Sequence, residues 1–402
     1  MPQIWHSFHF HYALTLWMMA HRLLSGSVCI AWYGGIALVW RFRKHYPRMS
    51  GLRFKPDQLT DLPMLSILVP ACNESSTVAR AMASLLQLDY PNFEVIAVND
   101  RSSDDTGEIL DSLAAQDSRL KVIHLERLPE GWLGKNHALH VASQAAIGEW
   151  MLFTDADVVY RRDAMQVAVA YAKQKNLDHL VVCPHCEGHD FWEKLFMSYF
   201  LFMFLLRVRP WDVANPKSRS FYGFGAFNMV KSDSYLTSGG HTVLPMEVAD
   251  DYKLGKTLKR KGFRSGMLDG SDYLSIRWVF GLEGIWNGFT KNAYASFDFN
   301  LIRTFLGALA LALTALYPVF GLLVPNPLAQ TLSLFTLFAM AGGAFAMRRV
   351  TGAGSLYGFA YPLAGLLVIA IIVRSTWVTH RQSGIVWRGT SYKLEELKRG
   401  VV

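Results

Sequence analysis

Carboxylates at two places in this chain have the type and spacing that metal-assisted or acid–base chemistry requires. Asp155 and Asp157 are separated by one residue and come directly after the apolar run 150–153. Hard divalent cations such as Mg²⁺ or Mn²⁺ prefer carboxylate oxygens together with substrate phosphates. A metal held there would offset the charge on a departing diphosphate. A D-x-D pair alone is a weak signal, but its place after an apolar run strengthens it.

Asp250 and Asp251 form the second group, just ahead of an expected helix over residues 252–261. A helix N-terminus attracts carboxylates electrostatically, so capping is one interpretation of this pair. A general base that removes a proton from an acceptor hydroxyl is the other. The two residues alone do not decide between them.

Two further segments are candidates for binding an anion or a nucleoside. Residues 131–136 form a glycine-containing loop ahead of a helix, where backbone amides and Lys135 would suit an anion. A plain surface loop fits this segment equally well. Asp100 ends a second apolar run, where it could hold a base or ribose, while Ser103 or Asp104 would cap the helix that follows.

Arg277 and Trp278 follow a short expected strand. A guanidinium can clamp a diphosphate through two parallel hydrogen bonds. A lone Arg-Trp pair is more often surface packing, so both interpretations stand.

A group of soft ligands invites a zinc interpretation: Cys183, His185, Cys186 and His189. Structural zinc needs four ligands at regular spacing, and the chain has no second cysteine pair. Packed thiols are therefore the favoured interpretation there.

The elements that would position these residues alternate between strands and helices. Short β-rich runs occur at 65–70, 93–98, 120–125 and 150–153, and helical spacing occurs at 75–86, 105–115 and 136–146. This alternation predicts an α/β domain with a mostly parallel sheet over residues 41–300. Ligands bind beyond the carboxyl ends of such strands. Glu74, Asp100, Asp155 and Asp157 all fall there, and this convergence is stronger than any single motif.

Composition excludes several classes of protein. The chain has 402 residues, of which 51% are apolar and 18% charged, so it is not a disordered chain. Its net charge of +8 is mild for a nucleic-acid binder, and the basic residues do not form one stripe. We therefore expect no nucleic-acid partner.

Apolar residues are concentrated in four runs without Asp, Glu, Lys or Arg: 23–40, 304–324, 328–347 and 356–373. Each is long enough to cross a bilayer core. Basic residues after the first run (Arg41, Arg43 and Lys44 among them) mark the cytoplasmic side. We therefore expect residues 1–40 to contain an interfacial segment followed by a transmembrane anchor. A transporter would need charges inside the spans, so we expect residues 301–374 to be anchors too.

The C-terminal tail, residues 375–402, conflicts with this topology. Three C-terminal crossings would place it outside, yet its Lys and Arg residues favour the cytoplasm. Pro362 could break the last apolar run into a re-entrant hairpin, which would resolve the conflict. Both interpretations stay open.

Two segments of the expected α/β domain are unusually apolar. Residues 191–208 are apolar on nearly every face but too short to span, and residues 279–299 carry Trp286 and Phe289. Both could lie in the membrane interface, where a lipid hydroxyl could reach the domain, or pack in the core. We favour the interfacial interpretation, with a membrane lipid as acceptor.

Taken in order, these pieces resemble the membrane-anchored family 2 glycosyltransferases, which have a GT-A nucleotide-sugar-binding fold. The matching pieces lie within about residues 64–300, at 69–74, 98–106, 134–136, 154–157, 250–251 and 277–278. The subgroup that the chain resembles most glycosylates lipids: ceramide glucosyltransferases and the hopanoid- and carotenoid-associated bacterial enzymes. Those also have one N-terminal anchor, several C-terminal spans and a tail similar to residues 387–392.

The resemblance implies a role for each matching residue. Glu74 and Asp100 would contact the nucleoside, and Lys135 the nucleotide. Asp155 and Asp157 would hold the diphosphate and a Mg²⁺ or Mn²⁺ ion. Asp251 would be the catalytic base, and Asp250 stands where the family often has Glu.

The family's Gln-x-x-Arg-Trp motif is half present, because Leu274 replaces the Gln while Arg277 and Trp278 remain. That Gln-containing motif helps processive polysaccharide synthases to hold the growing chain. Its loss favours transfer of a single sugar.

These observations together predict an integral inner-membrane enzyme with a cytoplasmic catalytic domain. It would transfer one sugar, with inversion, from a nucleotide-sugar (a UDP-sugar is the expected donor) to a lipid hydroxyl. The alternatives are a polyisoprenyl phosphate or polysaccharide acceptor, and a catalytically silent membrane scaffold of the same fold.

Overall fold

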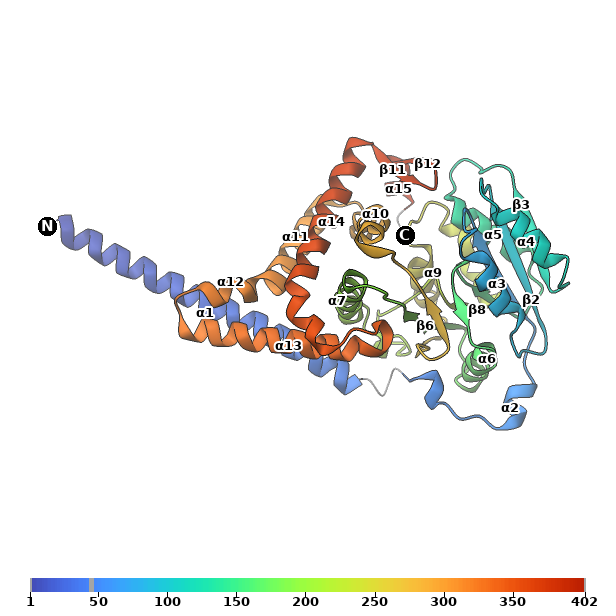
Figure 1. Cartoon of the computed structure of the whole chain (residues 1–402), viewed down its shortest axis with the longest axis horizontal. Helices are drawn as coiled ribbons and strands as arrows, with labels where there is room; N and C mark the ends of the chain where they lie inside the picture. Colours follow the sequence, from blue (N-terminus) through green and yellow to red (C-terminus); the bar gives the residue numbers. More distant parts are fainter. Residues whose placement is uncertain (1, 43–46, 401–402) are drawn as a thin grey trace.

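The computed structural model describes residues 2–42 and 47–400 and contains a central seven-stranded sheet (Figure 1). The strand order is β3-β2-β1-β4-β8-β6-β9. The strands are β1 (Leu65–Ala71), β2 (Phe93–Asp100), β3 (Leu120–Leu125), β4 (Trp150–Phe153), β6 (His179–Cys183), β8 (Asn228–Lys231) and β9 (Ser265–Asp269). A smaller sheet joins β5 (Val159–Tyr160), β10 (Leu274–Ile276) and β7 (His185–Cys186).

The central sheet is mostly parallel, as the alternating pattern predicts. β1 lies parallel to both β2 and β4, β3 is parallel to β2, and β9 is parallel to β6. Only β8 runs antiparallel to its neighbours, β4 and β6. The central strands are buried on both faces, which explains why they read as continuous apolar runs. The carboxyl ends of β1, β2 and β4 therefore meet at one edge, together with the amino end of β8.

Helices cover the sheet on both faces. They are α2 (Pro56–Thr60), α3 (Val78–Leu86), α4 (Thr106–Ala114), α5 (Gly134–Ala145), α6 (Ala164–Gln174), α8 (Ser232–Ser238) and α9 (Asp250–Arg260). α3 and α4 start later than expected, at Val78 and Thr106, and two helices start earlier than expected. α5 begins at Gly134, and α9 begins at Asp250, so the Asp250-Asp251 pair occupies its first turn. The N-cap residue of α4 is Asp105, not the expected Ser103 or Asp104, and its side chain makes no capping bond. Asp104, one residue earlier, accepts a hydrogen bond from the Thr106 amide.

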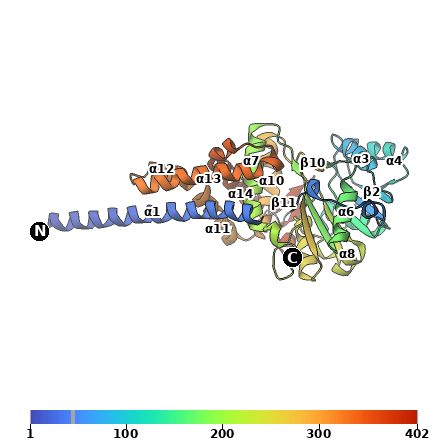
Figure 2. The same ribbon diagram turned by 90° about the horizontal axis from the view of Figure 1, so that it is seen from below.

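An arm of apolar helices projects from the sheet domain (Figures 1 and 2). It consists of α1 (Pro2–Phe42), α11 (Leu301–Leu311), α12 (Tyr317–Leu323) and α13 (Pro327–Thr351), and α14 (Tyr361–Arg381) adjoins it. Within the described residues, four helices are long and apolar enough to cross a membrane: Leu14–Arg41, Leu301–Leu323, Pro327–Thr351 and Ser355–Arg381. The expected apolar runs fall within these four helices.

A π-helical turn (Ala312–Leu316) joins α11 to α12 just before Pro318. Pro318 has no backbone N–H, so it cannot donate to the carbonyl of Thr314 four residues earlier. The indole N–H of Trp32 in α1 donates to that carbonyl instead, at 2.9 Å. An unpaired carbonyl is costly in a bilayer, so this bond both pairs the group and fixes α1 against α12.

The last apolar run is a short 3-10 turn (Ser355–Ala360) followed by the unbroken helix α14. Of the two interpretations left open, the one in which Pro362 breaks this run into a hairpin does not agree with the structure. Pro362 lies in the first turn of α14, where a missing N–H costs nothing. α14 continues past residue 374, where we expected the tail to begin.

Both ends of α14 contact the catalytic domain. Tyr361, at its start, hydrogen-bonds Ser198 at 2.8 Å, and Ser375, near its end, accepts from the Tyr294 amide at 2.9 Å. α14 runs across the direction of α1 and α13 (Figure 1). The tail therefore starts on the side of the arm where the catalytic domain lies, which agrees with its basic residues.

The two apolar segments of the domain form α7 (Phe191–Val208) and α10 (Gly281–Ala293). α7 packs between the domain and the arm, where Phe202 is fully buried and stacks on Trp32 with ring centroids 5.4 Å apart. α7 is therefore covered by protein on its arm side rather than being free to lie in an interface.

The tail folds back as a hairpin of β11 (Gly384–Trp387) and β12 (Thr390–Lys393), followed by α15 (Leu394–Arg399). Ile385, Tyr392 and Leu397 of this tail are buried in a small apolar cluster with Leu133 and Val248 of the catalytic domain.

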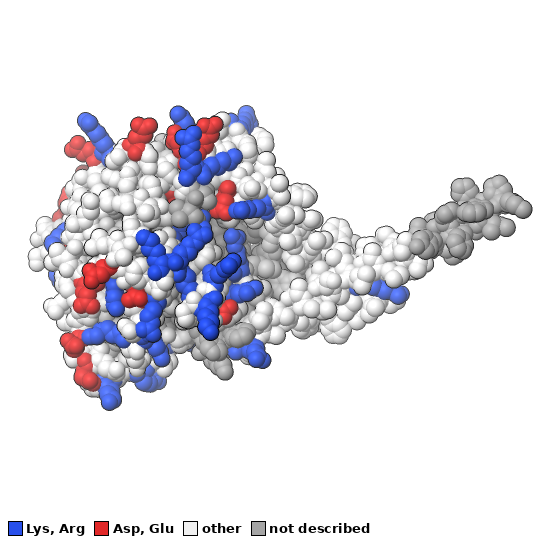
Figure 3. Space-filling view, turned by 180° about the vertical axis from the view of Figure 1, so that it is seen from behind, with Lys and Arg blue, Asp and Glu red and all other residues white. Residues whose placement is uncertain are grey.

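Charge is distributed unevenly over the surface. Figure 3 shows an arm almost free of charged side chains, with Lys and Arg gathered on the domain close to where the arm joins it. Of the basic residues that follow the first apolar run, Arg43 and Lys44 lie outside the described residues.

Candidate active site

A cavity of about 560 Å³ opens at the edge where the strand ends meet. Eight of the nine predicted site residues line it: Glu74, Asp100, Lys135, Asp155, Asp157, Asp250, Asp251 and Trp278. They come from the ends of β1, β2 and β4, from the starts of α5 and α9, and from the segment after β10. The sheet topology therefore gathers side chains that are far apart in sequence.

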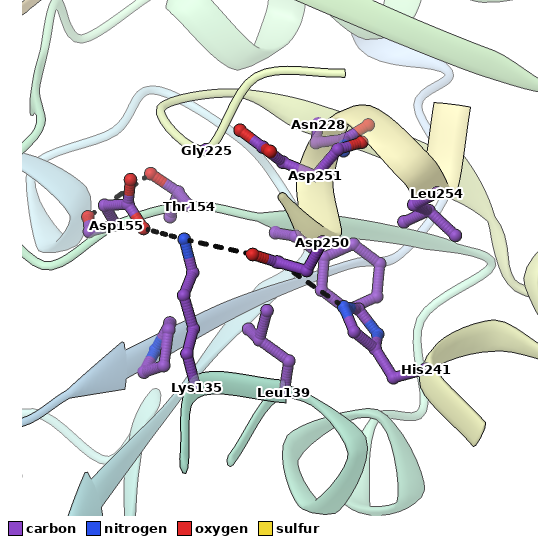
Figure 4. A pocket seen from close by; sticks show the side chains of 12 residues that line it. Lys135, Leu139, Thr154, Asp155, Gly225, Asn228, His241, Asp250, Asp251 and Leu254 are labelled. Carbon is purple, nitrogen blue, oxygen red and sulfur yellow. Dashed lines mark hydrogen bonds and ion pairs between the residues drawn. The ribbon is translucent and has the colours of Figure 1, made fainter. Parts of the chain in front are cut away.

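Three of these residues and a histidine form a row on the floor of the cavity, in the order Asp155, Lys135, Asp250 and His241 (Figure 4). Lys135 Nζ lies 2.7 Å from Asp155 Oδ1 and 3.9 Å from Asp250 Oδ1, and His241 Nε2 lies 3.8 Å from Asp250 Oδ2. Burial alone would lower the pKa of Lys135, but Asp155, Asp250 and Asp251 together raise it well above its ordinary value. Lys135 is therefore a fixed cation that holds Asp155 and Asp250 in place.

Asp155 and Asp157 fit a divalent cation. Asp157 Oδ1 is buried and has no hydrogen-bond partner among the described residues. Burial, with added repulsion from Asp155 and Glu74, raises the pKa of Asp157 to about 7. A cluster of carboxylates that repel one another and leave one oxygen unpaired is what a Mg²⁺ or Mn²⁺ ion stabilises, with its other ligands drawn from water or phosphate.

Asp250 and Asp251 have different surroundings. Asp250 is buried, and although burial would raise its pKa, Lys135 and His241 hold the pKa below the usual range. Asp251 is half-buried, and burial, followed by repulsion from Asp250, raises its pKa to about 7. Its carboxylate points away from the row of charges in Figure 4. The arrangement gives one fixed anion and one carboxylate able to exchange a proton near neutral pH.

Asp100 is buried and forms a bidentate pair with Arg101, at 2.7 and 3.1 Å. The absence of a side chain at Gly134 leaves room for this ion pair, because a Cβ at that position would lie 2.4 Å from Asp100 Oδ2. The amide of Gly134 donates to the Tyr392 hydroxyl at 3.2 Å. Gly134 therefore allows the Asp100 carboxylate to approach closely, and its amide binds the tail through Tyr392. That amide already has a hydrogen-bond partner within the protein.

Arg277 is the predicted site residue that the structure does not bring to the cavity. Its Nη2 donates to Glu193 Oε1 at 2.9 Å, and its guanidinium lies over the ring of Phe280. Glu193 is fully buried and also accepts from the amides of His189 and Gly281. The expected diphosphate clamp at Arg277 is therefore wrong in this structure, because a buried carboxylate from α7 already holds that guanidinium.

Several cations that line the cavity were not predicted as site residues, among them Lys291 of α10 and Arg388 of the tail. Arg388 pairs with Glu74 Oε1, 314 residues away in the chain. The tail segment 387–392 was noted as a family feature, so a signal for Arg388 existed, but nothing in the sequence placed it at the cavity. Lys291 gave no signal beyond its place in an apolar segment.

The side of the cavity next to α7 and α10 is aromatic. Trp278 packs edge-on against Phe200 and Phe224, and Phe289 lies beside it with ring centroids 5.3 Å apart. This aromatic wall (Phe200, Phe224, Trp278 and Phe289) suits an apolar or sugar-like ligand.

The cysteines and histidines of the soft-ligand group have different environments, since Cys186 is buried and His189 is exposed. Cys186 is buried, and Cys183 Sγ contacts the Tyr222 hydroxyl at 3.9 Å. His185 Nδ1 hydrogen-bonds the Arg349 carbonyl, and His189 pairs with Glu187. These four side chains point to separate partners rather than to a common centre.

The fold and this acidic cavity define the class of protein: the chain has a GT-A-like glycosyltransferase fold. The mannosyltransferase PcManGT from Pyrobaculum calidifontis, solved in complex with GDP-Man and Mn²⁺, matches it with a TM-score of 0.50 at 20% identity. That match covers 90% of this chain and 99% of the mannosyltransferase chain, and it shows the fold.

The sequence comparisons agree with this fold. Residues 66–236, less than half of the chain, match the model of the glycosyl transferase family 2, which marks that segment as a family 2 glycosyltransferase domain. Two relatives, both named 4,4'-diaponeurosporenoate glycosyltransferase, come from Staphylococcus aureus. The one from strain USA300 is 25% identical, and the one from strain bovine RF122 / ET3-1 is 24% identical. Each match covers 93% of this chain and 98% of the relative. The chain is thus a glycosyltransferase with membrane helices.

Proposed function

We propose that the protein transfers a single sugar from a nucleotide-sugar to a membrane lipid. One observation carries the proposal: a single cavity connects a cluster of carboxylates at strand ends with an aromatic wall beside the arm. The carboxylates suit a metal-bound diphosphate, and the aromatic wall suits an apolar acceptor. A lipid could enter this cavity without leaving the bilayer.

The donor would bind across the strand ends. Glu74 and Asp100, at the ends of β1 and β2, would contact the nucleoside, and Lys135 would contact the nucleotide. A UDP-sugar is our expected donor. Because the structurally similar mannosyltransferase was solved with GDP-Man, the test below includes both nucleotides.

Asp155 and Asp157 would hold Mg²⁺ or Mn²⁺, which would neutralise charge on the diphosphate when bound. Gly225 keeps the approach to Asp155 open, because a Cβ there would lie 2.4 Å from Asp155 Oδ2.

Asp251 would act as the general base. It would accept the proton of the acceptor hydroxyl as that oxygen bonds to the anomeric carbon and the nucleoside diphosphate leaves from the opposite face, which inverts the configuration. Asp250 is held ionised by Lys135, and its negative charge would raise the proton affinity of Asp251. The raised pKa of Asp251 suits this role, because a base works best with a pKa near the operating pH.

A second candidate has an acceptor that is already ionised. The relatives are named for a carotenoid-type acceptor whose name ends in "-oate", that is, a carboxylate. A carboxylate or a polyisoprenyl phosphate needs no base. Asp251 would then orient the acceptor or the sugar rather than remove a proton.

The proposed location is the inner membrane, with the catalytic domain in the cytoplasm and the organisation expected from the sequence: anchor 1–40, catalytic domain 41–300, membrane helices 301–374 and tail 375–402. The basic surface beside the arm supports this orientation, since cytoplasmic segments next to membranes carry excess Lys and Arg.

The test uses the full chain, purified in detergent and returned to vesicles made from bacterial lipids. UDP-glucose, UDP-GlcNAc or GDP-mannose is supplied with Mn²⁺, and glycosylated lipid is measured by mass spectrometry alongside nucleoside diphosphate release. Asp251→Asn should bind donor normally and lose turnover by about a hundredfold or more. Asp233→Asn, at an exposed aspartate of α8, is the matched control.

Three outcomes are informative. Full turnover in Asp251→Asn would contradict a hydroxyl acceptor and favour an acceptor that is already ionised. Failure of the unaltered protein to bind any of these nucleotide-sugars would favour the silent scaffold. Repeated addition of sugars to one acceptor would contradict single transfer.

A further inference from the structure

The cavity needs a cation that the sequence assigned to the wrong residue. A nucleoside diphosphate that leaves a sugar carries more negative charge than one divalent ion offsets. Arg277 was expected to meet that charge, but it is held by the buried Glu193. Lys135 can contact the nucleotide, but two carboxylates, Asp155 and Asp250, already balance its charge. Another positive group should therefore face the phosphates.

Lys291 has the surroundings of an anion-binding residue. It is half-buried on α10 and lines the cavity, and its ammonium lies 4.2 Å from the ring centroid of Trp387. Among the described residues this cation–π contact is its partner, and no carboxylate lies within ion-pair distance. Burial, followed by repulsion from Arg388 and Lys135, lowers its pKa to about 8. A half-buried ammonium surrounded by other cations is costly unless an anion joins them.

Arg388 is held beside it by an unusual turn. Arg388 and Gly389 form the two-residue loop between β11 and β12, and both have positive φ, 49° and 79°. Such loops favour Asn-Gly or Gly-Gly, because a side chain other than Asn or Asp is strained at the first position. The turn thus carries an arginine where a smaller residue would be more stable. It directs this arginine to Glu74, at the end of β1 where the donor is expected.

The hairpin that carries Arg388 is docked, not loose. Thr390 accepts a hydrogen bond from Arg101 at 3.4 Å, and Tyr392 accepts one from the Gly134 amide at 3.2 Å. Tyr392 is buried with Leu133 of the loop that precedes α5. The cations are therefore pre-positioned, which lowers the entropic cost of binding a ligand.

We propose that Lys291 and Arg388 bind the diphosphate of the nucleotide-sugar donor and take the place that the sequence assigned to Arg277. This inference rests on the proposed function, since it names the groups that receive the donor's phosphates. The guanidinium of Arg388 suits a bidentate contact with one phosphate group, and the ammonium of Lys291 acts as a point charge for the diphosphate. Trp387 keeps Lys291 extended toward the cavity.

The test is a set of binding measurements on the full chain in detergent micelles with Mn²⁺. The probes are UDP, UMP and uridine, with GDP, GMP and guanosine as the parallel series. Lys291→Met removes the charge, keeps an unbranched side chain and breaks no ion pair. It should weaken binding of the diphosphate about tenfold or more while binding of the nucleoside stays unchanged. Lys393→Met, at an exposed lysine of the β11–β12 hairpin, should change neither.

Arg388→Met and Arg388→Lys form the second arm. The methionine variant should also lose diphosphate affinity, and the lysine variant should recover part of it, because charge returns without the bidentate geometry. Thermal unfolding of each variant checks that the hairpin remains docked.

The failures can be told apart. If the unaltered protein binds neither UDP nor GDP, the proposed function itself fails. If it binds and transfers sugar while Lys291→Met and Arg388→Met bind diphosphate as tightly as before, or lose nucleoside and diphosphate affinity equally, only the assignment of these two cations is overturned.

Discussion

Asp250 and Asp251 are adjacent in sequence but differ chemically because each has different neighbours. Successive residues of a helix point about 100° apart, so only Asp250 faces Lys135 and His241. The pKa of Asp250 is held low, whereas that of Asp251 is raised to about 7. Of these two neighbours, therefore, Asp251 is the one that changes its charge near neutral pH.

This difference predicts the pH dependence of the reaction. A base must be ionised to accept a proton, and the pKa of Asp251 lies above the ordinary aspartate value, so activity should rise with pH up to about 7 and then level off. On the acid side, kcat/KM for the donor should fall about tenfold for each pH unit. The measurement is initial rate against pH at low donor concentration, with circular dichroism to confirm folding. If kcat/KM instead fell only near the ordinary pKa of an aspartate, Asp251 would not be the base whose ionisation controls the rate.

The residues that sequence analysis located correctly are those fixed by local rules. Asp155 and Asp100 follow buried strands, and strand ends of a parallel sheet meet at one edge, so their convergence was predictable. Arg277 was misplaced because its partner, Glu193, lies on α7, and no local pattern reveals that pairing. Arg388 was missed for the same reason, since its contact with Glu74 depends on how the tail folds back.

At the scale of elements, the loop before β8 determines the position of the Asp155 carboxylate. β8 is antiparallel to β4, so its amino end and the loop that contains Gly225 lie beside the carboxyl end of β4. The amide of Asp155 donates to the Gly225 carbonyl at 3.0 Å. The backbone of the loop thus approaches Asp155 too closely for a side chain.

Gly225→Ala should therefore displace the Asp155 carboxylate and its pair with Lys135. We expect donor turnover to fall about tenfold or more and the apparent Mn²⁺ affinity to weaken, with a loss of stability of about 1–3 kcal/mol. Mn²⁺ titration of activity and thermal unfolding measure these effects. Gly354→Ala is the control, since its φ of −76° suits alanine and no atom lies within 4 Å of the added Cβ. Unchanged turnover in Gly225→Ala would show that Asp155 does not need this position.

The elements themselves were largely predictable, and their ends were not. β3 and β4 match the expected runs residue for residue, because short runs of apolar, β-branched and aromatic residues identify strands well, both at the sheet edge (β3) and in its buried centre (β4). α9 starts two residues before expectation, since nothing in the sequence separates a first turn from a preceding loop. The sequence left α14 undecided because a proline can either break a helix or occupy its first turn, where it is favourable, and Pro362 occupies the first turn.

At the scale of the whole molecule, the path of the chain determines where the tail lies. α13 ends beside the catalytic domain, where the Arg349 carbonyl accepts from His185. α14 starts and ends beside that domain, and in Figure 1 it lies across the direction of the arm. The tail then reaches the active-site cavity through Arg388 and Tyr392. The turn between α12 and α13, around Pro325, lies toward the far end of the arm.

This path makes a prediction about sidedness that labelling can test in cells. Pro325→Cys introduces a thiol at an exposed position of the far turn, and Ser391→Cys introduces one at an exposed position of the tail. With the catalytic domain in the cytoplasm, a membrane-impermeant maleimide should label Pro325→Cys in intact spheroplasts, and Ser391→Cys only after permeabilisation. The unaltered chain, whose four cysteines remain, supplies the background in both states. Labelling of Ser391→Cys in intact spheroplasts, with Pro325→Cys protected, would reverse the orientation. Labelling of both would mean that α14 crosses the bilayer and that the tail contacts seen here do not persist in the membrane.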